Sequence, residues 1–150
     1  MERAIALSIE NVLSGSGGPF AALVVRDGSI LAAGTNQVTT MLDPTAHAEV
    51  VAIRAACQAA QNFQLIDCEL YTTCEPCPMC MGAIYWARLA KVHYANTRDD
   101  AARIGFDDSL IYDQLELPPG RRKIPMHQLM RDQALEAFRE WERSPAKVKY

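Results

Sequence analysis

The sequence predicts an α/β fold, a three-layer αβα sandwich around a mixed five-stranded sheet, with residues 1–150 forming one domain. Three observations support this prediction. Short apolar runs alternate with helical segments, which is the element order of a layered α/β fold. Asp27-Gly28 separates two apolar runs and predicts a tight hairpin, hence an antiparallel pair of strands. Later, a helical segment lies between two strand-like runs, which predicts a βαβ crossover and a parallel pair.

The first half of the chain begins with an amphipathic helix at about Arg3–Leu13, which the serine- and glycine-rich residues 14–18 end. The apolar runs Phe20–Arg26 and Ser29–Thr35 are the strands of the hairpin. Ala46–Ala60 is expected to be helical. Because its polar residues follow one narrow stripe, most of this helix should be buried against the sheet.

The second half supplies the crossover unit. Glu69–Thr73 is a predicted strand, Cys77–Arg88 a helix and Ala90–Ala95 the parallel strand that follows. Ile124–Met130 is the candidate for a fifth strand. Ala134–Arg143 has apolar residues at helical spacing and is expected to be the closing helix.

Composition limits the classes of function. The chain is 49% hydrophobic and 22% charged, which is ordinary for a soluble globular protein. Its net charge of −3 predicts no overall attraction to nucleic acid or to an anionic membrane. The first residues are too polar to span a membrane. Five cysteines without a secretion signal pattern predict a cytoplasmic protein that binds metal rather than one that forms disulfides.

His47-Ala48-Glu49 and Pro76-Cys77-Pro78-Met79-Cys80 carry the strongest chemical signal. His47, Cys77 and Cys80 are zinc ligands of mixed nitrogen and sulfur type, and three protein ligands leave the fourth tetrahedral position for water, as in catalytic sites. Glu49 is a carboxylate that is not a ligand and can carry protons to and from the reacting groups. The two patterns together are the known signature of zinc-dependent nucleobase deaminases. We therefore predict one catalytic Zn²⁺ per chain.

The spacing also predicts where these residues lie. His47 and Glu49 are two residues apart and can share a cavity only at the mouth of a helix, which Asp43 or Thr45 can cap. Pro44 suits the first turn of that helix. The prolines around Cys77 place both cysteines in the first turn of a second helix, where the helix dipole favours thiolates.

A structural zinc site is the alternative interpretation. Cys74 precedes Cys77 and Cys80 in a double C-x₂-C run, so that with His47 these residues can close a Cys₃His site. A structural zinc site gives Glu49 no role and does not require the ligands to lie at helix N-termini. Both halves of the motif together favour the catalytic interpretation.

The chain closely resembles the bacterial guanine deaminases of the cytidine-deaminase-like superfamily over nearly its whole length. Asp43–Glu49 and Cys74–Arg88 carry the resemblance and are shared in part with tRNA adenosine deaminases. Gly105–Tyr112, which begins GFDDS, is the more selective segment. Ala21 departs from the glycine expected after Phe20.

The resemblance implies roles for further residues. Asp108 resembles the family's second proton-shuttling carboxylate, and Asn36 the asparagine that hydrogen-bonds the purine. Phe20 and Trp86 resemble aromatic walls of the pocket. The segment at about 131–150 resembles one that is exchanged within a homodimer, which would bring Tyr150 over the partner's active site.

From the residues alone, each of these has another interpretation. Asp108 can cap the following turn, and Asn36 is a common residue in turns. Phe20 and Trp86 can pack in the core. Tyr150 would ordinarily belong to a frayed tail.

The resemblance implies hydrolytic deamination of guanine, a small purine base, to xanthine and ammonia, without a nucleic-acid or membrane partner. One alternative is a tRNA adenosine deaminase, which should carry a basic surface for phosphates. Another is a deaminase of guanosine or of a different aminated heterocycle. A structural zinc module is the non-enzymatic alternative, and retention of Glu49 argues against it.

Overall fold

A computed structural model describes residues 1–149, and Tyr150, which the family resemblance implies to bind substrate, lies outside this range. The contacts divide the chain into two compact units, residues 1–108 and residues 109–150. No helix in the described chain is both long enough and apolar enough to cross a membrane. The first unit contains α1 (Glu2–Leu13), β1 (Ala21–Arg26), β2 (Ser29–Thr35), α2 (Val38–Met41), α3 (Ala48–Ala60), β3 (Cys68–Cys74), α4 (Pro78–Ala87), β4 (Lys91–Asn96) and α5 (Arg98–Arg103).

The strands form a mixed sheet in the order β2-β1-β3-β4. β1 pairs antiparallel with β2 and with β3, and β3 pairs parallel with β4. Asp27 and Gly28 have φ values of 49° and 74°, as a tight hairpin turn requires. The predicted hairpin and the predicted β3–α4–β4 crossover are both confirmed.

The prediction of a fifth strand was wrong. Within residues 1–149 the sheet has four strands, and residues 124–130 form no strand. A strand needs a neighbouring strand to pair its backbone N–H and C=O groups. The side-chain pattern of a segment does not provide that neighbour. Pro125 also removes one of the donors that a ladder would use.

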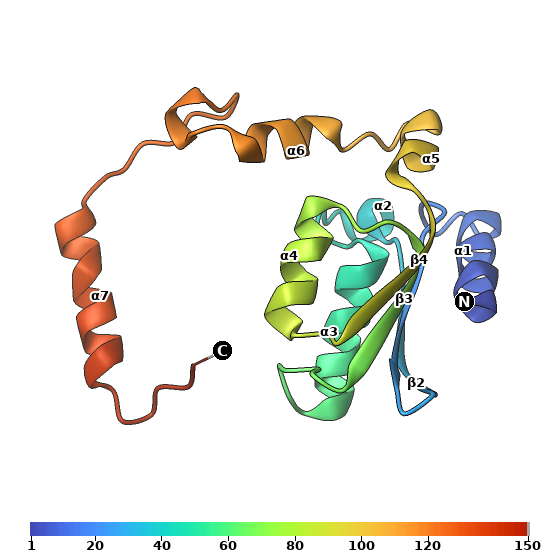
Figure 1. The fold of residues 1–150 in the computed structure, drawn as a ribbon, viewed down its shortest axis with the longest axis horizontal. Coiled ribbons are helices and arrows are strands. Elements are labelled where there is room, and N and C mark those ends of the chain that lie inside the picture. The colour runs from blue at the N-terminus through green and yellow to red at the C-terminus, as the bar shows by residue number, and fades with distance from the viewer. Residues whose placement is uncertain (150) are drawn as a thin grey trace. The chain divides into compact units, whose positions relative to one another are not determined.

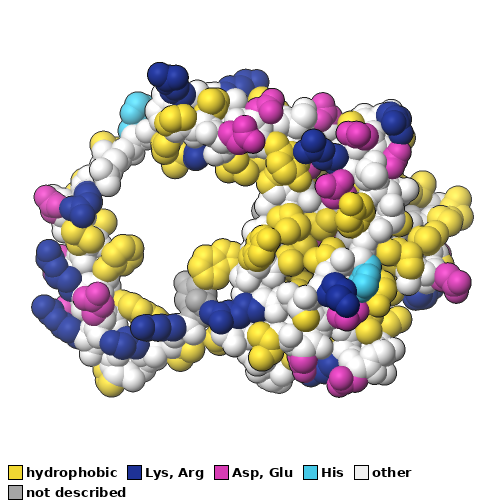
Figure 2. Space-filling view, in the orientation of Figure 1, with side chains coloured by type: hydrophobic (Ala, Val, Ile, Leu, Met, Phe, Trp, Pro, Cys, Tyr) yellow, Lys and Arg dark blue, Asp and Glu magenta, His cyan; other side chains and the backbone are white. Residues whose placement is uncertain are grey.

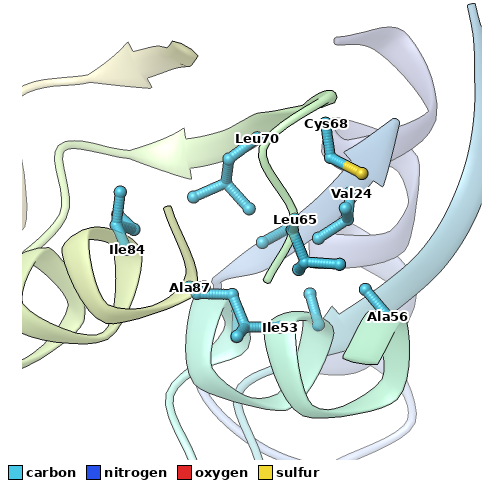
Figure 3. Close-up of a cluster of buried hydrophobic side chains, with 11 residues drawn as sticks. Val24, Ile53, Ala56, Leu65, Cys68, Leu70, Ile84 and Ala87 are labelled. Carbon is cyan, nitrogen blue, oxygen red and sulfur yellow. The ribbon is translucent and has the colours of Figure 1, made fainter. Parts of the chain in front are cut away.

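Helices lie on both faces of the sheet in the first unit. Figure 1 shows α1 on one face and α3 with α4 on the other. The core lies between the sheet and the helices α3 and α4 (Figure 3). Val24 and Leu70 point from the strands towards Ile53 of α3 and Ile84 of α4.

The close approach of α3 to β2 depends on small residues. Ala48 and Ala52 of α3 are fully buried. A Cβ atom at Gly34 of β2 would lie 2.4 Å from the backbone oxygen of Ala48 and 2.5 Å from the backbone nitrogen of Ala52. Only glycine fits there, and this contact fixes the N-terminus of α3 against the sheet.

The second unit contains α6 (Ser109–Glu116), the 3₁₀ helix η1 (Pro119–Arg121) and α7 (Arg131–Arg143). None of its described residues, 109–149, is buried. Hydrophobic side chains lie at its surface (Figure 2). Those that are exposed in α6, in α7 and between them are Leu110, Ile111, Leu115, Ile124, Met126, Leu129, Met130, Phe138 and Trp141.

Candidate metal and deaminase site

Two helix N-termini place the predicted metal ligands. His47 is the N-cap residue of α3 and Cys77 is the N-cap residue of α4, both with extended backbone, and Cys80 lies in the first turn of α4. Pro78 is the first residue of α4. An N-cap residue has not yet entered the helix, so its side chain can lie beside that of a residue in the first turn. The helix-mouth arrangement predicted for His47 and Glu49 is therefore confirmed.

The residues predicted to cap this helix do something else. Neither Asp43 nor Thr45 is the N-cap of α3. The Asp43 carboxylate accepts hydrogen bonds from the Thr45 backbone N–H at 2.8 Å and from its hydroxyl at 2.7 Å. These bonds hold the pKa of Asp43 below its usual value. Asp43 and Thr45 thus close the turn before the helix, and Pro44 lies in that turn instead of in the helix.

The three donor atoms fit a zinc ion. His47 Nδ1 lies 3.6 Å from Cys77 Sγ and 3.6 Å from Cys80 Sγ, and the two sulfurs are 3.6 Å apart. Zinc bonds of about 2.3 Å to sulfur and about 2.0 to 2.1 Å to nitrogen give tetrahedral edges of about 3.6 to 3.8 Å. The donor triangle therefore already has the dimensions of a tetrahedral site.

Cys74 is not part of this triangle. Among residues 1–149, the group of three donors whose ligand atoms lie within 4.8 Å of one another is His47, Cys77 and Cys80. The Cys74 thiol instead lies 3.6 Å from the backbone oxygen of Thr97, and burial raises its pKa to about 11. A neutral thiol bonded elsewhere does not close a Cys₃His site, so the fourth position faces no described protein ligand.

Hydrogen bonds join the three donor residues and shift their pKa values. A hydrogen bond joins the Cys77 and Cys80 sulfurs, and this bond is the main reason that the pKa of Cys77 falls to about 4. The same bond, followed by burial, raises the pKa of Cys80. The hydrogen bond to Cys77 raises the pKa of His47. A metal ion that binds the cluster replaces these protons, so that binding releases them.

Glu49 lies next to the triangle without belonging to it. Its side chain is buried, and the Thr72 hydroxyl donates a hydrogen bond of 2.9 Å to Oε1. Oε2 lies 3.4 Å from Cys80 Sγ. Burial raises the pKa of the Glu49 carboxyl, which shifts it towards the range in which a carboxylate exchanges protons near neutral pH.

Asn36 and Phe20 come together at the ends of two neighbouring strands. Asn36 follows β2 and is buried, and its backbone N–H donates to the Phe20 oxygen at 2.9 Å. Phe20 makes an edge-to-face contact with Phe106, with ring centroids 4.9 Å apart. A Cβ atom at Gly18 would lie about equally close to the Phe20 ring, the Asn36 amide carbon and the Phe106 ring. These three side chains thus surround one backbone position.

Sequence reasoning did not identify Phe106, although it lies in the GFDDS segment, nor Asn11. The Asn11 amide is buried and donates to the backbone oxygens of Gly18, at 2.9 Å, and Asn36, at 3.0 Å. At Gly17 a Cβ atom would lie 2.0 Å from the Asn36 oxygen. α1 therefore clamps the two segments that carry Phe20 and Asn36. A polar residue among the apolar positions of the first predicted helix was the available signal.

Asp108 and Trp86 are the remaining predicted site residues, and their surroundings differ. Burial, followed by the charge of Cys77, raises the pKa of Asp108, so this carboxyl lies within electrostatic reach of the donor triangle. Trp86, on α4, is 66% exposed. Six positions separate it from Cys80, which places the two side chains on different sides of the helix.

Metal analysis provides a direct check of the triangle. Purified protein is expected to contain one zinc per chain, and Cys77→Ser or His47→Ala should lose most of it because each removes one of three ligands. Cys74→Ser is the matched control and should keep the parent zinc content. Equal loss in Cys74→Ser would show that Cys74 is a fourth ligand and would contradict the open-site geometry.

Comparison with known proteins agrees with this geometry. Residues 1–96 match the family described as the cytidine and deoxycytidylate deaminase zinc-binding region. The chain is 52% identical to guanine deaminase of Bacillus subtilis over 150 residues, 100% of this chain and 96% of that one. A solved structure of the guanine deaminase from Bacillus subtilis superposes with a TM-score of 0.96 at 52% identity, covering 99% of this chain and 95% of that chain.

More distant relatives are of two kinds. A structure of guanine deaminase from Nitrosomonas europaea gives a TM-score of 0.67 at 31% identity, covering 95% of this chain and 82% of that chain. A tRNA-specific adenosine deaminase of Aquifex aeolicus is 43% identical over 77 residues, 51% of each chain. The full-length similarity is thus to guanine deaminases, while the tRNA enzyme matches about half of the chain. The chain belongs to the zinc-binding cytidine and deoxycytidylate deaminase family.

Proposed function

We propose that this chain catalyses the hydrolytic deamination of guanine to xanthine and ammonia with one bound Zn²⁺. The observation that carries the proposal is a donor triangle of zinc dimensions beside a buried carboxylate that is not a ligand. The 52% identity to a guanine deaminase over the full chain supports guanine as the substrate.

Glu49 is the proton carrier in this proposal. Zinc bound at the triangle would lower the pKa of a bound water towards ~7, which supplies a nucleophile at neutral pH. Glu49 accepts one proton from the attacking water and passes it to a purine ring nitrogen, where it stays, and then carries the second proton, from the newly added hydroxyl, to the amine, which leaves as ammonia. Because burial raises its pKa, the carboxyl can hold each proton while it is transferred.

Four other residues complete the proposed site. Asp108 contacts the exocyclic amine and assists its departure as ammonia. The Asn36 amide hydrogen-bonds the purine, and Phe20 lies against the purine ring. Trp86 forms a further aromatic wall. The buried position of Asn36, the contact of Phe20 with Phe106, and the electrostatic proximity of Asp108 to Cys77 support the first three assignments.

A tRNA adenosine deaminase is the weaker alternative. A protein that binds tRNA neutralises phosphates with lysine and arginine, whereas this chain has a net charge of −3. The full-length similarity to a guanine deaminase, set against 77 aligned residues for the tRNA enzyme, argues in the same direction.

Ammonia release from a substrate panel tests the proposal. The panel contains guanine, guanosine, adenine, cytosine and tRNA, each with zinc-loaded protein. Guanine should be the best substrate, and cytosine and tRNA should show essentially no turnover. A preference for tRNA that falls steeply with added salt would favour the alternative. A preference for guanosine would support the proposed deamination reaction but would make guanosine the substrate instead of guanine.

We further propose that the protein is a homodimer in which residues of the C-terminal segment, about 131–150, cross to the partner and bring Tyr150 over its active site. Helices of residues 109–149 that bury none of their own side chains need another protein surface to cover their apolar faces. A second copy is the partner that is always present. A mass measurement in solution should give twice the 16.6 kDa of one chain at all working concentrations, and a monomer of full activity would contradict this proposal.

The proposed site of action is the cytoplasm, in purine metabolism. All five cysteines are free thiols in the structure, which agrees with a reducing compartment.

A further inference from the structure

The Glu49 carboxylate is held by a residue from the sheet. Thr72 is fully buried, and its hydroxyl donates to Oε1 of Glu49 at 2.9 Å. Oε2, the other oxygen, lies on the side of the zinc donors and accepts a hydrogen bond from the Cys80 thiol at 3.4 Å. The two oxygens of one carboxylate therefore have different surroundings: one is anchored to a strand, and the other is directed to the metal site.

Thr72 is a rigid anchor. Its strand, β3, has neighbours on both sides, and Thr72 itself pairs with Ala22 of β1 and Tyr94 of β4. The same strand runs on, through residues 75 and 76, to Cys77 and the first turn of α4. The anchor of the carboxylate and two of the zinc ligands therefore belong to one continuous β3–α4 segment, whereas Glu49 arrives from α3.

A glutamate needs such an anchor for its proposed role. The last torsion angle of a glutamate side chain has a broad energy profile, so packing alone does not fix the plane of the carboxylate. Proton transfer requires the carrying oxygen to lie within hydrogen-bond reach of the reacting atoms, and small misplacements are costly. A proton carried on Oε1 would be directed at the sheet and away from the substrate.

We propose that Thr72 is a positioning residue for proton transfer, whose hydroxyl holds Oε1 of Glu49 and thereby leaves Oε2 as the oxygen that carries the proton. This inference rests on the proposed deaminase function. The proton that Oε2 takes from water is the one that it later gives to the purine, so the carboxylate ends each cycle as it began. Thr72 itself gains and loses no proton.

Thr72→Val is the principal test, because valine keeps the branched shape and removes only the hydroxyl. We expect kcat for guanine to fall by about tenfold to a hundredfold, with KM, zinc content and the affinity for xanthine close to those of the parent. Thr72→Ser keeps the hydroxyl and should recover most of kcat. If the valine variant does not fold, Thr72→Ala replaces it in the comparison with serine.

Thr73→Val is the matched control. Thr73 is the neighbouring buried threonine of β3, and its hydroxyl accepts a bond from the Ala21 backbone N–H at 3.0 Å without touching Glu49. The Thr73→Val variant should keep the parent kcat even if its melting temperature falls. Parent-like kcat in Thr72→Val, an equal loss of kcat in Thr72→Ser, or an equal loss in the control would each overturn the inference.

A structural measurement separates this inference from the proposed function. In crystals of the zinc-loaded proteins, the Glu49 carboxylate should have one orientation in the parent and in Thr72→Ser, and more than one in Thr72→Val. A single unchanged orientation in all three would overturn the role of Thr72 whatever the substrate proves to be. If the parent releases no ammonia from guanine while the orientations differ as expected, the substrate assignment fails and the positioning of Glu49 by Thr72 stands.

Discussion

Glu49→Gln is expected to abolish nearly all turnover while the protein keeps its fold and its zinc. Glutamine has the shape of glutamate, and its amide oxygen can still accept the Thr72 hydrogen bond, but it cannot carry a proton. Loss of general acid–base catalysis alone lowers the rate by about 10²- to 10⁴-fold. The measurements are kcat for ammonia release and zinc content.

The same variant should be at least as stable as the parent. Because burial raises the pKa of Glu49, its charged form is disfavoured in the folded chain relative to water, and neutral glutamine avoids this cost. Its melting temperature should therefore be equal or higher. Glu10→Gln, on the exposed face of α1, is the control and should match the parent in activity. Turnover near the parent rate in Glu49→Gln would mean that another group carries the proton.

Deletion of residues 146–150 is expected to lower turnover of guanine by an order of magnitude or more, with zinc and the folded core retained. α7 ends at Arg143, and Ser144 before Pro145 has an extended backbone with ψ of 124°, so the last residues leave the helix direction. If they cross to the partner, they close its active site and exclude water from the reacting purine. A truncated protein with the parent rate would show that the tail has no role.

Mixed dimers show whether the tail acts on its own chain or on the partner. A Glu49→Gln chain carries an intact tail, and a truncated chain carries an intact Glu49. If tails are exchanged, one site of the mixed dimer combines Glu49 of the truncated chain with the tail of the other chain. Co-refolding the two nearly inactive proteins should then restore activity well above that of either alone. Absence of recovery in verified mixed dimers would place each tail over its own chain's site.

Local signals were sufficient for much of the fold. Asp27-Gly28 fixes the hairpin because both residues adopt positive φ. Pro78 marks the first residue of α4, as its missing N–H and fixed φ predict. The residues of the donor triangle could be predicted because their types and spacing match the coordination preferences of zinc.

The errors concern hydrogen-bond partners that residue type alone does not specify. Ile124–Met130 was predicted to be a strand, yet it contains Pro125, and a strand also requires a paired neighbour, which its own sequence does not specify. Asp43 is a good N-cap residue by type, but its side chain satisfies the Thr45 backbone and hydroxyl instead. Both were assigned from the segment alone, and in each case competing or missing backbone partners decided the outcome.

The site residues that the sequence did not reveal act through long-range contacts. Thr72 reaches Glu49 across 23 positions of the chain, and Asn11 reaches Asn36 across 25. Neither belongs to a motif, and a buried threonine in a strand is ordinary. These contacts become visible only when the chain is folded, because Thr72 bonds to the motif residue Glu49, and Asn11 bonds to Asn36, which the family resemblance had pointed to.

We expect the protein to add water to guanine and to release ammonia, and the isotope of the incorporated oxygen tests this reaction most directly. Zinc-loaded protein is incubated with guanine in water enriched in ¹⁸O, and xanthine and ammonia are quantified. We predict equal amounts of the two products and one water-derived oxygen in each xanthine, labelled to the ¹⁸O enrichment of the water, with almost no product formed by Glu49→Gln. Unchanged guanine after prolonged incubation with the zinc-loaded parent, or xanthine without ¹⁸O, would contradict the claim.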